Sequence, residues 1–204
     1  MKVTWLGGAG LLFEGENARI LVNCVEEGAA DVLLFTSARY LCPERVAAVL
    51  KKNPDAVVLA SRSAYAALSD LADDYNITPL SPHSVFSEKG ITFYAVRSEC
   101  ADEKASGFIL DDGKKTYYVS GDTLYNYEVL DDVLELVEDG VDYAFLPING
   151  RGGSMNAKDA ADFAYELGAE NAVPLYYGAR PGNPDEFDFE EGKIVLLPNT
   201  PAEL

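Results

Sequence analysis

The sequence predicts an α/β fold of two facing mixed sheets with helices outside them, an αββα sandwich. The predicted elements run twice through the same order, a strand-rich meander followed by alternating strands and helices. Two strands of the first alternating stretch, Asp31–Phe35 and Ala56–Ala60, are short apolar runs, typical of strands buried on both faces. With 204 residues, of which 48% are hydrophobic and 25% charged, the chain can bury a sizeable core. We therefore expect residues 1–204 to form a single domain.

The first half opens with β-rich runs and continues with strands that precede helices. The opening runs are separated by glycine-containing turns: Lys2–Leu6, Leu11–Glu14 and Arg19–Val22. Two apolar runs follow, each ahead of a helical pattern: Asp31–Phe35 and Ala56–Ala60. Pro43 suits the first turn of the first helix, and Ser61 or Ser63 caps the second.

The second half repeats this order. Its meander has three runs and a hairpin turn at residues 111–113: Ile91–Val96, Ala105–Leu110 and Thr116–Val119. Two helices are predicted next, Leu130–Val137 and Ala157–Leu167, the second closed by Gly168. The remaining strands are Tyr143–Pro147, Ala172–Leu175 and Lys193–Leu197.

Composition argues against several classes of protein. The 34 acidic and 16 basic residues give a formal net charge of −18, unsuited to nucleic acid or an anionic membrane, because phosphate is bound by clustered lysine and arginine. No apolar stretch reaches the roughly 18 residues that a membrane span needs. Three cysteines and an N-terminus unlike a signal peptide favour reduced thiols, so we expect a cytoplasmic protein.

Histidine is almost absent from the sequence. His83 is the one histidine among 204 residues, and zinc hydrolases build their sites largely from imidazole. The chain therefore cannot hold a histidine-rich metal site. His83 stands in a Ser-Pro-His-Ser stretch, and we expect it in a surface turn without a catalytic role.

A series of short segments matches one known family in order and spacing. The most specific is Ser-Gly-Asp-Thr at residues 120–123, and the others are residues 4–10, 20–23, 31–36, 106–109, 146–150 and 173–178. Together they resemble the metallo-β-lactamase superfamily, in particular its short bacterial branch of predicted metal-dependent hydrolases related to ascorbate-6-phosphate lactonase. The resemblance covers most of residues 1–180 and implies the αββα fold of that family.

The resemblance fails at the metal ligands. The family's His-x-His-x-Asp-His motif would begin after Thr36, where this chain reads Ser-Ala-Arg-Tyr-Leu-Cys over residues 37–42. Another histidine of the family corresponds to about Cys100 in this chain, and the last one corresponds to Tyr176. Of the family's metal ligands, this chain retains only the bridging aspartate, as Asp122. The resemblance therefore implies a degenerate metal site and a catalytically inactive protein, a pseudoenzyme.

Asp122 needs another positive partner if no metal ion is present. A buried carboxylate without a cation must find a compensating charge or take up a proton. Arg39 occupies a former ligand position in the same cleft. We therefore expect its guanidinium to fill the metal space and to pair with Asp122 in a fork-like geometry, which arginine suits better than lysine.

Two cysteines provide an alternative. Cys42 and Cys100 stand where ligands stood, and thiolates bind zinc well. With Asp122 they would hold one zinc or other soft divalent ion in a rebuilt site. That site would serve a hydrolase that attacks an ester, lactone or phosphodiester with metal-activated water. Structural sites need four ligands, however, so we expect no cofactor and two small core cysteines.

The other polar residues of the cleft could have either of two roles. Ser37, Arg39, Asn149 and Tyr176 would line a metal-free pocket for a small anion or a sugar-like molecule. Alternatively, they fill the old cleft with a satisfied hydrogen-bond network. Arg151, in a glycine-rich loop, is a weaker second candidate for anion contact.

Three functions remain open at this point. The leading one is a catalytically inactive homologue kept for small-molecule binding or protein interaction, and the second is the rebuilt hydrolase. The third is a structural partner of an active paralogue, with the oligomeric state left open.

The acidic stretch Asp185–Glu191 alternates carboxylates with phenylalanine. We expect it to form a solvated loop that holds two phenylalanine rings in place, rather than a docking surface for a basic partner.

Overall fold

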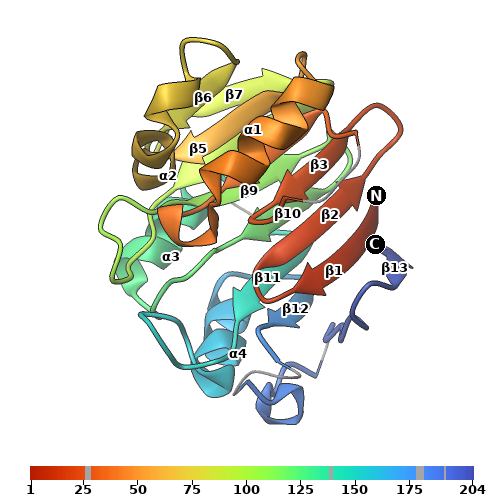
Figure 1. The fold of residues 1–204 in the computed structure, drawn as a ribbon. Coiled ribbons are helices and arrows are strands. Elements are labelled where there is room, and N and C mark those ends of the chain that lie inside the picture. The colour runs from red at the N-terminus through yellow and green to blue at the C-terminus, as the bar shows by residue number, and fades with distance from the viewer. Residues whose placement is uncertain (26–28, 138–139, 178–181, 191) are drawn as a thin grey trace.

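The structure is a computed structural model and describes residues 1–25, 29–137, 140–177, 182–190 and 192–204. The described strands form two facing sheets, as predicted (Figure 1). The first sheet has seven strands, in the spatial order β13 (Pro201–Glu203), β1 (Lys2–Gly7), β2 (Gly10–Glu14), β3 (Arg19–Val22), β4 (Val32–Phe35), β5 (Val57–Ser61) and β6 (Ile77–Leu80). The second has six, in the order β12 (Asn171–Leu175), β11 (Tyr143–Pro147), β10 (Thr116–Val119), β9 (Gly107–Asp111), β8 (Ile91–Val96) and β7 (Val85–Glu88).

Helices cover the outer face of each sheet. They are α1 (Pro43–Lys52), α2 (Arg62–Ala67), α3 (Tyr127–Leu134) and α4 (Ala157–Glu166). One apolar cluster joins α1 and α2 to the first sheet, and another joins α3 and α4 to the second, which completes the predicted αββα order. No helix in the described part of the chain is long and apolar enough to cross a membrane.

The central core lies between the two sheets. Phe13 of β2 meets Phe145 of β11 edge to face, with ring centroids 5.4 Å apart, a geometry that aromatic pairs prefer. The two strands predicted to be buried on both faces, β4 and β5, are buried along their whole length, and so is β11. Apolar packing on both faces explains why these runs lack the alternation of a half-exposed strand.

Two of the predicted elements differ from the structure. The strand expected at Lys193–Leu197 is wrong: Lys193 makes an isolated bridge to Ala172, and the chain then runs on without a ladder. Its apolar pattern reflects the burial of Leu196 in the central core rather than strand pairing. Helix α3 starts three residues before the predicted Leu130, because the Asn126 side chain accepts the backbone N–H of Glu128 and caps the helix there.

Three further strands, β6, β7 and β13, were not expected from the sequence. They are short, and β6 contains Pro79. Pro79 is tolerated because β6 is an edge strand of the first sheet, where one side of the backbone needs no ladder hydrogen bond. Prolines also stand in two other edge strands, Pro174 in β12 and Pro201 in β13.

The sheets come close together where β4 and β10 end. Gly121 follows β10 with φ +65°, a left-handed conformation that favours glycine. A Cβ atom at this position would lie 2.8 Å from Thr36 Oγ1 and 2.9 Å from Thr36 Cβ, just beyond β4. The missing side chain therefore lets the two strand ends meet, and it fixes the place of the next residue, Asp122.

Replacing Gly121 by alanine tests this contact. Gly121→Ala combines left-handed strain with overlap against Thr36 and should lower the free energy of unfolding by about 3 kcal/mol. Gly113→Ala is the matched control, because Gly113 also has positive φ but has open space where its Cβ would be, so about 1 kcal/mol is expected. Urea unfolding measures both, and equal losses would show that the contact with Thr36 is not tight.

Candidate functional site

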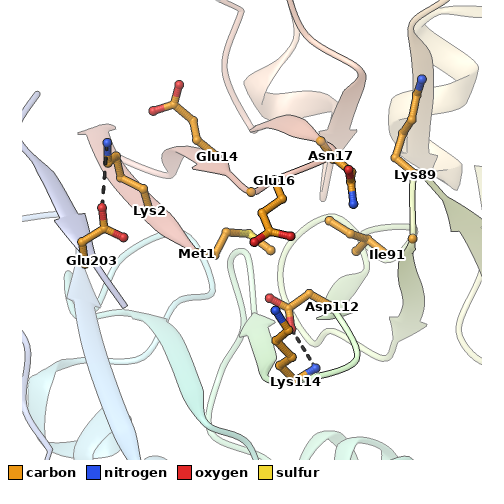
Figure 2. Close-up of a pocket in the computed structure, with 13 residues that line it drawn as sticks. Met1, Lys2, Glu14, Glu16, Asn17, Lys89, Ile91, Asp112, Lys114 and Glu203 are labelled. Atoms are coloured by element: carbon orange, nitrogen blue, oxygen red, sulfur yellow. Dashed lines mark hydrogen bonds and ion pairs between the residues drawn. The ribbon is translucent and has the colours of Figure 1, made fainter.

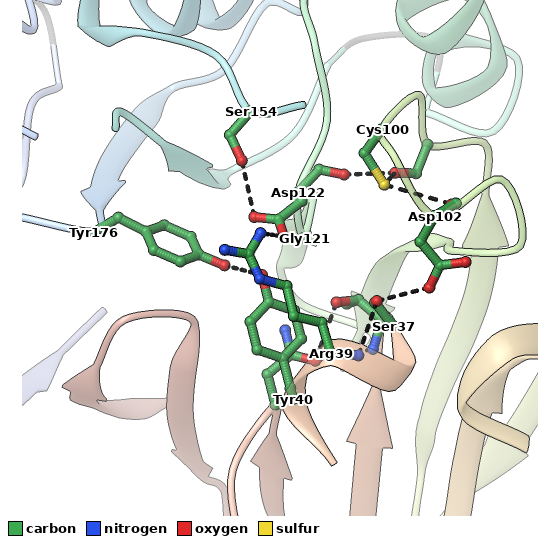
Figure 3. Close-up of polar contacts among 12 residues, drawn as sticks. Ser37, Arg39, Tyr40, Cys100, Asp102, Gly121, Asp122, Ser154 and Tyr176 are labelled. Atoms are coloured by element: carbon green, nitrogen blue, oxygen red, sulfur yellow. Dashed lines mark hydrogen bonds and ion pairs between the residues drawn. The ribbon is translucent and has the colours of Figure 1, made fainter. Parts of the chain in front are cut away.

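The candidate site forms where the carboxyl ends of strands from both sheets meet. Arg39 and Tyr40 lie in a 3-10 turn, Ala38–Tyr40, that follows β4 and is capped by the Ser37 side chain. Asp122 follows β10, and Tyr176 follows β12 directly. Figure 3 shows these side chains converging on one space. Carboxyl ends of parallel strands are the usual place for a ligand site in α/β proteins.

Asp122 is paired with Arg39, as the sequence analysis expects. Arg39 Nη1 lies 2.8 Å from Asp122 Oδ2, and the carboxylate raises the pKa of the guanidinium (Figure 3). The expected fork is absent from this contact, because Oδ1 instead accepts a 2.8 Å hydrogen bond from Ser154 Oγ. Asp122 is 4% exposed whereas the Arg39 side chain is 49% exposed, so the carboxylate is buried and the guanidinium keeps one face to solvent.

Two tyrosines close the space beside this pair. The hydroxyls of Tyr40 and Tyr176 form a short hydrogen bond (Figure 3). Burial and then the neighbouring Asp122 raise the pKa of Tyr40, and burial, Tyr40 and Asp122 raise the pKa of Tyr176. Both side chains are therefore neutral phenols at neutral pH, which can donate a proton to a hydrogen bond but are poor bases.

Ser37 takes part in a different set of contacts from the predicted pocket. Its hydroxyl donates to Asp102 Oδ2 at 2.8 Å, and Ser63 Oγ donates to the same oxygen at 2.5 Å. Burial would raise the pKa of Asp102, but these hydrogen bonds and one from the backbone of Lys104 outweigh it and lower the pKa. The Asp102 carboxylate is thus held in its ionised form, and it joins the start of α2 to the loop after β8.

The glycine-rich loop approaches the arginine through its backbone. A Cβ atom on Gly152 would lie 2.8 Å from Arg39 Nη1, so the loop passes directly beside the guanidinium. Arg151, the second anion candidate, is exposed. Asn149 makes a backbone bridge with Asn156, and its buried Oδ1 has no hydrogen-bond partner in the described part of the chain.

The residues of the cysteine alternative do not lie together as one ligand group in the described part of the chain. Cys42 precedes α1, where its Sγ lies 3.3 Å from Glu44 Oε2. Cys100 is half-buried, its Sγ lies 3.5 Å from the Asp102 carbonyl oxygen, and burial raises the pKa of its thiol. Cys42, Cys100 and Asp122 do not form a metal-binding group, since no group of three or more His, Cys, Asp or Glu among the described residues could hold a metal ion.

The side chains around Asp122 do not fit a metal ion. Its two oxygens bind a guanidinium and a serine hydroxyl. A guanidinium has no lone pair to offer as a ligand, and its fixed positive charge opposes a second cation in the same space. Neutral phenols and serine hydroxyls are weak ligands compared with imidazole or thiolate. The donor set therefore suits an internal ion pair.

His83 lies in the turn between β6 and β7, as expected, but it is not without a partner. Its Nε2 lies 3.2 Å from Asp132 Oδ1 on α3, while its side chain is 59% exposed. Asp132 is buried, and its Oδ2 accepts the backbone N–H of Arg97 at 2.6 Å. This pair holds the turn between the sheets against α3. No pattern in the sequence pointed to Asp132.

Four other residues of the site were missed by sequence reasoning, namely Tyr40, Ser63, Asp102 and Ser154. Tyr40 was visible inside the altered motif at residues 37–42 but was not separated from it. The other three lack any local signal, because their partners lie between 32 and 65 residues away in the sequence. Only the fold brings them together.

A cavity of about 520 Å³ lies at the opposite end of the sheets, near the turns before β3, β8 and β10 (Figure 2). Lysines and carboxylates alternate around it, and some of them pair, such as Lys2 with Glu203 at 3.8 Å. The mixed charges give this cavity no preference for a ligand of one sign. It lies apart from the Asp122 site.

The sequence also matches a family profile. The profile describes a "Beta-lactamase superfamily domain" and matches residues 19–177, which is well over half of the chain. The chain belongs to the β-lactamase superfamily. No curated protein sequence matches it.

Solved structures of other proteins share the fold. Igni18, a metallo hydrolase from Ignicoccus hospitalis, has a TM-score of 0.78 and 18% identity, covering 100% of this chain and 98% of that one. YhfI, a metallo-β-lactamase fold protein from Bacillus subtilis, has a TM-score of 0.74 and 14% identity over 99% of both chains. An isothiocyanate hydrolase from Delia radicum gut bacteria has a TM-score of 0.71 and 14% identity, covering 100% and 99%. At these identities the likeness is one of fold.

A double-mutant cycle measures the central ion pair of this superfamily member. Arg39→Met and Asp122→Asn should each lower the free energy of unfolding by about 2 kcal/mol, because each leaves a buried or charged partner without its hydrogen bond. The double variant should lose less than the sum, with a coupling of about 1 kcal/mol or more. Arg45→Met, at an exposed position on α1, is the control and should change stability by less than about 0.5 kcal/mol. Additive losses would contradict the pairing.

Proposed function

We propose that this chain is a catalytically inactive member of the superfamily, a pseudoenzyme in which the Arg39 guanidinium provides the positive charge beside Asp122. The contact of 2.8 Å between Arg39 Nη1 and Asp122 Oδ2 carries the proposal. With this pair in place, the carboxylate is neutralised by the chain itself. Its described neighbours are a guanidinium, a serine hydroxyl and two phenols with raised pKa values, and none of these side chains is a strong base that could activate a nucleophile.

A histidine-based nucleophile is also unavailable in this arrangement. The lone histidine, His83, pairs with Asp132 on α3 rather than with a serine or cysteine of the site. The phenols of Tyr40 and Tyr176 have raised pKa values and do not act as bases near neutral pH. Activated nucleophiles need a base within hydrogen-bond reach. These observations favour binding or assembly over turnover.

The site retains a means of binding a small anion. The Arg39 side chain is half exposed, and its contact with Asp122 uses one of five N–H donors. The glycine-rich loop brings backbone close to the same guanidinium. We propose that a small anion, such as a phosphate or carboxylate group, binds the exposed face of Arg39. A protein partner at this face, including an active paralogue, is the alternative role.

Metal analysis tests the inactive state. We expect untagged protein purified without chelator to contain less than about a tenth of an equivalent of zinc, manganese, iron or nickel, since the donors around Asp122 do not suit these ions. Elemental analysis of the purified protein measures this. About one equivalent of metal, lost in Cys42→Ser or Cys100→Ser, would overturn the proposal and restore the rebuilt hydrolase.

Anion binding at Arg39 is tested by thermal shift. At constant ionic strength, inorganic phosphate should raise the Tm of the wild type and of Arg45→Met, because a ligand that binds only the folded state stabilises it. Arg39→Met should lose the increase. Arg62→Gln, a change outside this site, should keep it. An equal rise in Tm for wild type and Arg39→Met would contradict anion binding at this residue and leave assembly as the role.

A further inference from the structure

A second cavity, of about 560 Å³, lies between α2, the turn between β6 and β7, and the start of α3. Residues 97–106, the loop after β8, connect its two sides. The volume is in the range of small-molecule sites, about 300–1,000 Å³. Every residue that lines it belongs to the described part of the chain. It adjoins the Asp122 site, because Ser98 in its lining donates from Oγ to the Asp122 carbonyl oxygen at 2.7 Å, but Arg39 and Asp122 do not line it.

The side of the cavity next to α2 is positively charged. Arg62 begins α2 and donates from Nε to Ser81 Oγ at 2.9 Å, which fixes the guanidinium and leaves its terminal N–H groups available. Lys104 is held on the same side, because its carbonyl oxygen accepts the backbone N–H of Ser63. Glu103 is the one carboxylate beside these two cations among the lining residues. Basic side chains therefore outnumber acidic ones here.

The side of the cavity next to α3 carries more negative than positive charge. The backbone of Glu99 is held there, because its N–H donates to Thr123 Oγ1 at 3.1 Å and its carbonyl accepts from Leu124 N at 2.8 Å. Glu128, on α3, forms a 2.8 Å ion pair with Arg97. Arg97 thus neutralises the carboxylate of Glu128, whereas Glu99 Oε2 accepts a hydrogen bond from the uncharged Asn126 amide and keeps its negative charge.

The cavity also has a buried hydroxyl. Ser106 lines it and is 1% exposed. Its backbone N–H donates to the Thr36 carbonyl oxygen at 3.0 Å, which fixes the residue at the junction of the two sheets. A serine hydroxyl both donates and accepts, so it can bind either end of a polar ligand.

We propose that this cavity binds a small zwitterion of the amino acid class. Its carboxylate would meet Arg62 and Lys104, and its ammonium group would meet Glu99 on the facing side. A simple anion would be repelled by the carboxylates next to α3, and a simple cation by the bases next to α2. A molecule that carries both charges can pair with both sides of the cavity. Its positive charge also offsets the repulsion that the net charge of −18 on the chain exerts on simple anions.

The test uses amino acids of increasing length at low salt: glycine, β-alanine, 4-aminobutanoate and 6-aminohexanoate. Isothermal titration should give a Kd below about 1 mM for at least one of them. Butanoate and butylammonium, which each carry one charge, should bind at least about tenfold more weakly, since each satisfies one side only. Absence of binding by every amino acid at about 10 mM, or equal binding of the singly charged compounds, would overturn the proposal.

Variants locate the binding. Arg62→Gln and Glu99→Gln should each weaken binding of the best amino acid at least about tenfold, whereas Arg45→Gln on α1 should not change it. Lys104→Gln serves as a second basic-side variant if circular dichroism shows that Arg62→Gln does not fold. Arg39→Met should keep the binding. Loss of binding in Arg39→Met alone would place the ligand at Asp122 and contradict this cavity as the site.

Discussion

The buried charge of Asp122 is the constraint on which the carboxyl-end side of the sandwich depends. A carboxylate that is 4% exposed costs several kcal/mol in desolvation unless it is paired and hydrogen-bonded. Arg39 and Ser154 each satisfy one of its oxygens. Arg39 is suited to this because its turn lies directly after β4 and its head group remains half in solvent, so that its own desolvation is small. The charge is therefore balanced by residues from both halves of the chain.

One short segment makes three side-chain contacts between the two halves. Residues 37–40 follow β4, and each of three side chains there reaches a partner that follows a strand of the second sheet: Ser37 to Asp102, Arg39 to Asp122 and Tyr40 to Tyr176. Neighbouring hydrogen bonds in a partly buried place reinforce one another, because each one fixes groups that the next one needs. The altered motif thus has a structural role of its own.

The sequence predicted the architecture well because its signals are local. Apolar runs such as Val32–Phe35 and the Ser-Gly-Asp-Thr segment carry the fold within a few residues. The pairing of Arg39 with Asp122 was predictable because the family resemblance placed both residues in one cleft and a buried carboxylate needs a cation. Ser154 and Asp102 were not predictable, because any serine or aspartate in a loop has the same local signature. The strand expected at Lys193–Leu197 failed for a related reason: an apolar alternation shows burial, whereas pairing depends on a neighbour distant in sequence.

The prolines at the margins of the sheets bear on how this chain behaves at high concentration. An open strand edge offers a row of unused N–H and C=O groups to another chain, and such edges start aggregation. Pro79, Pro174 and Pro201 stand in three of the edge strands, where each removes one N–H donor from that row. Strand β13, with three residues and the exposed Glu203, is also too short to template a long ladder. These three edges are thus poor partners for intermolecular β-pairing, and strong negative charge adds mutual repulsion between copies.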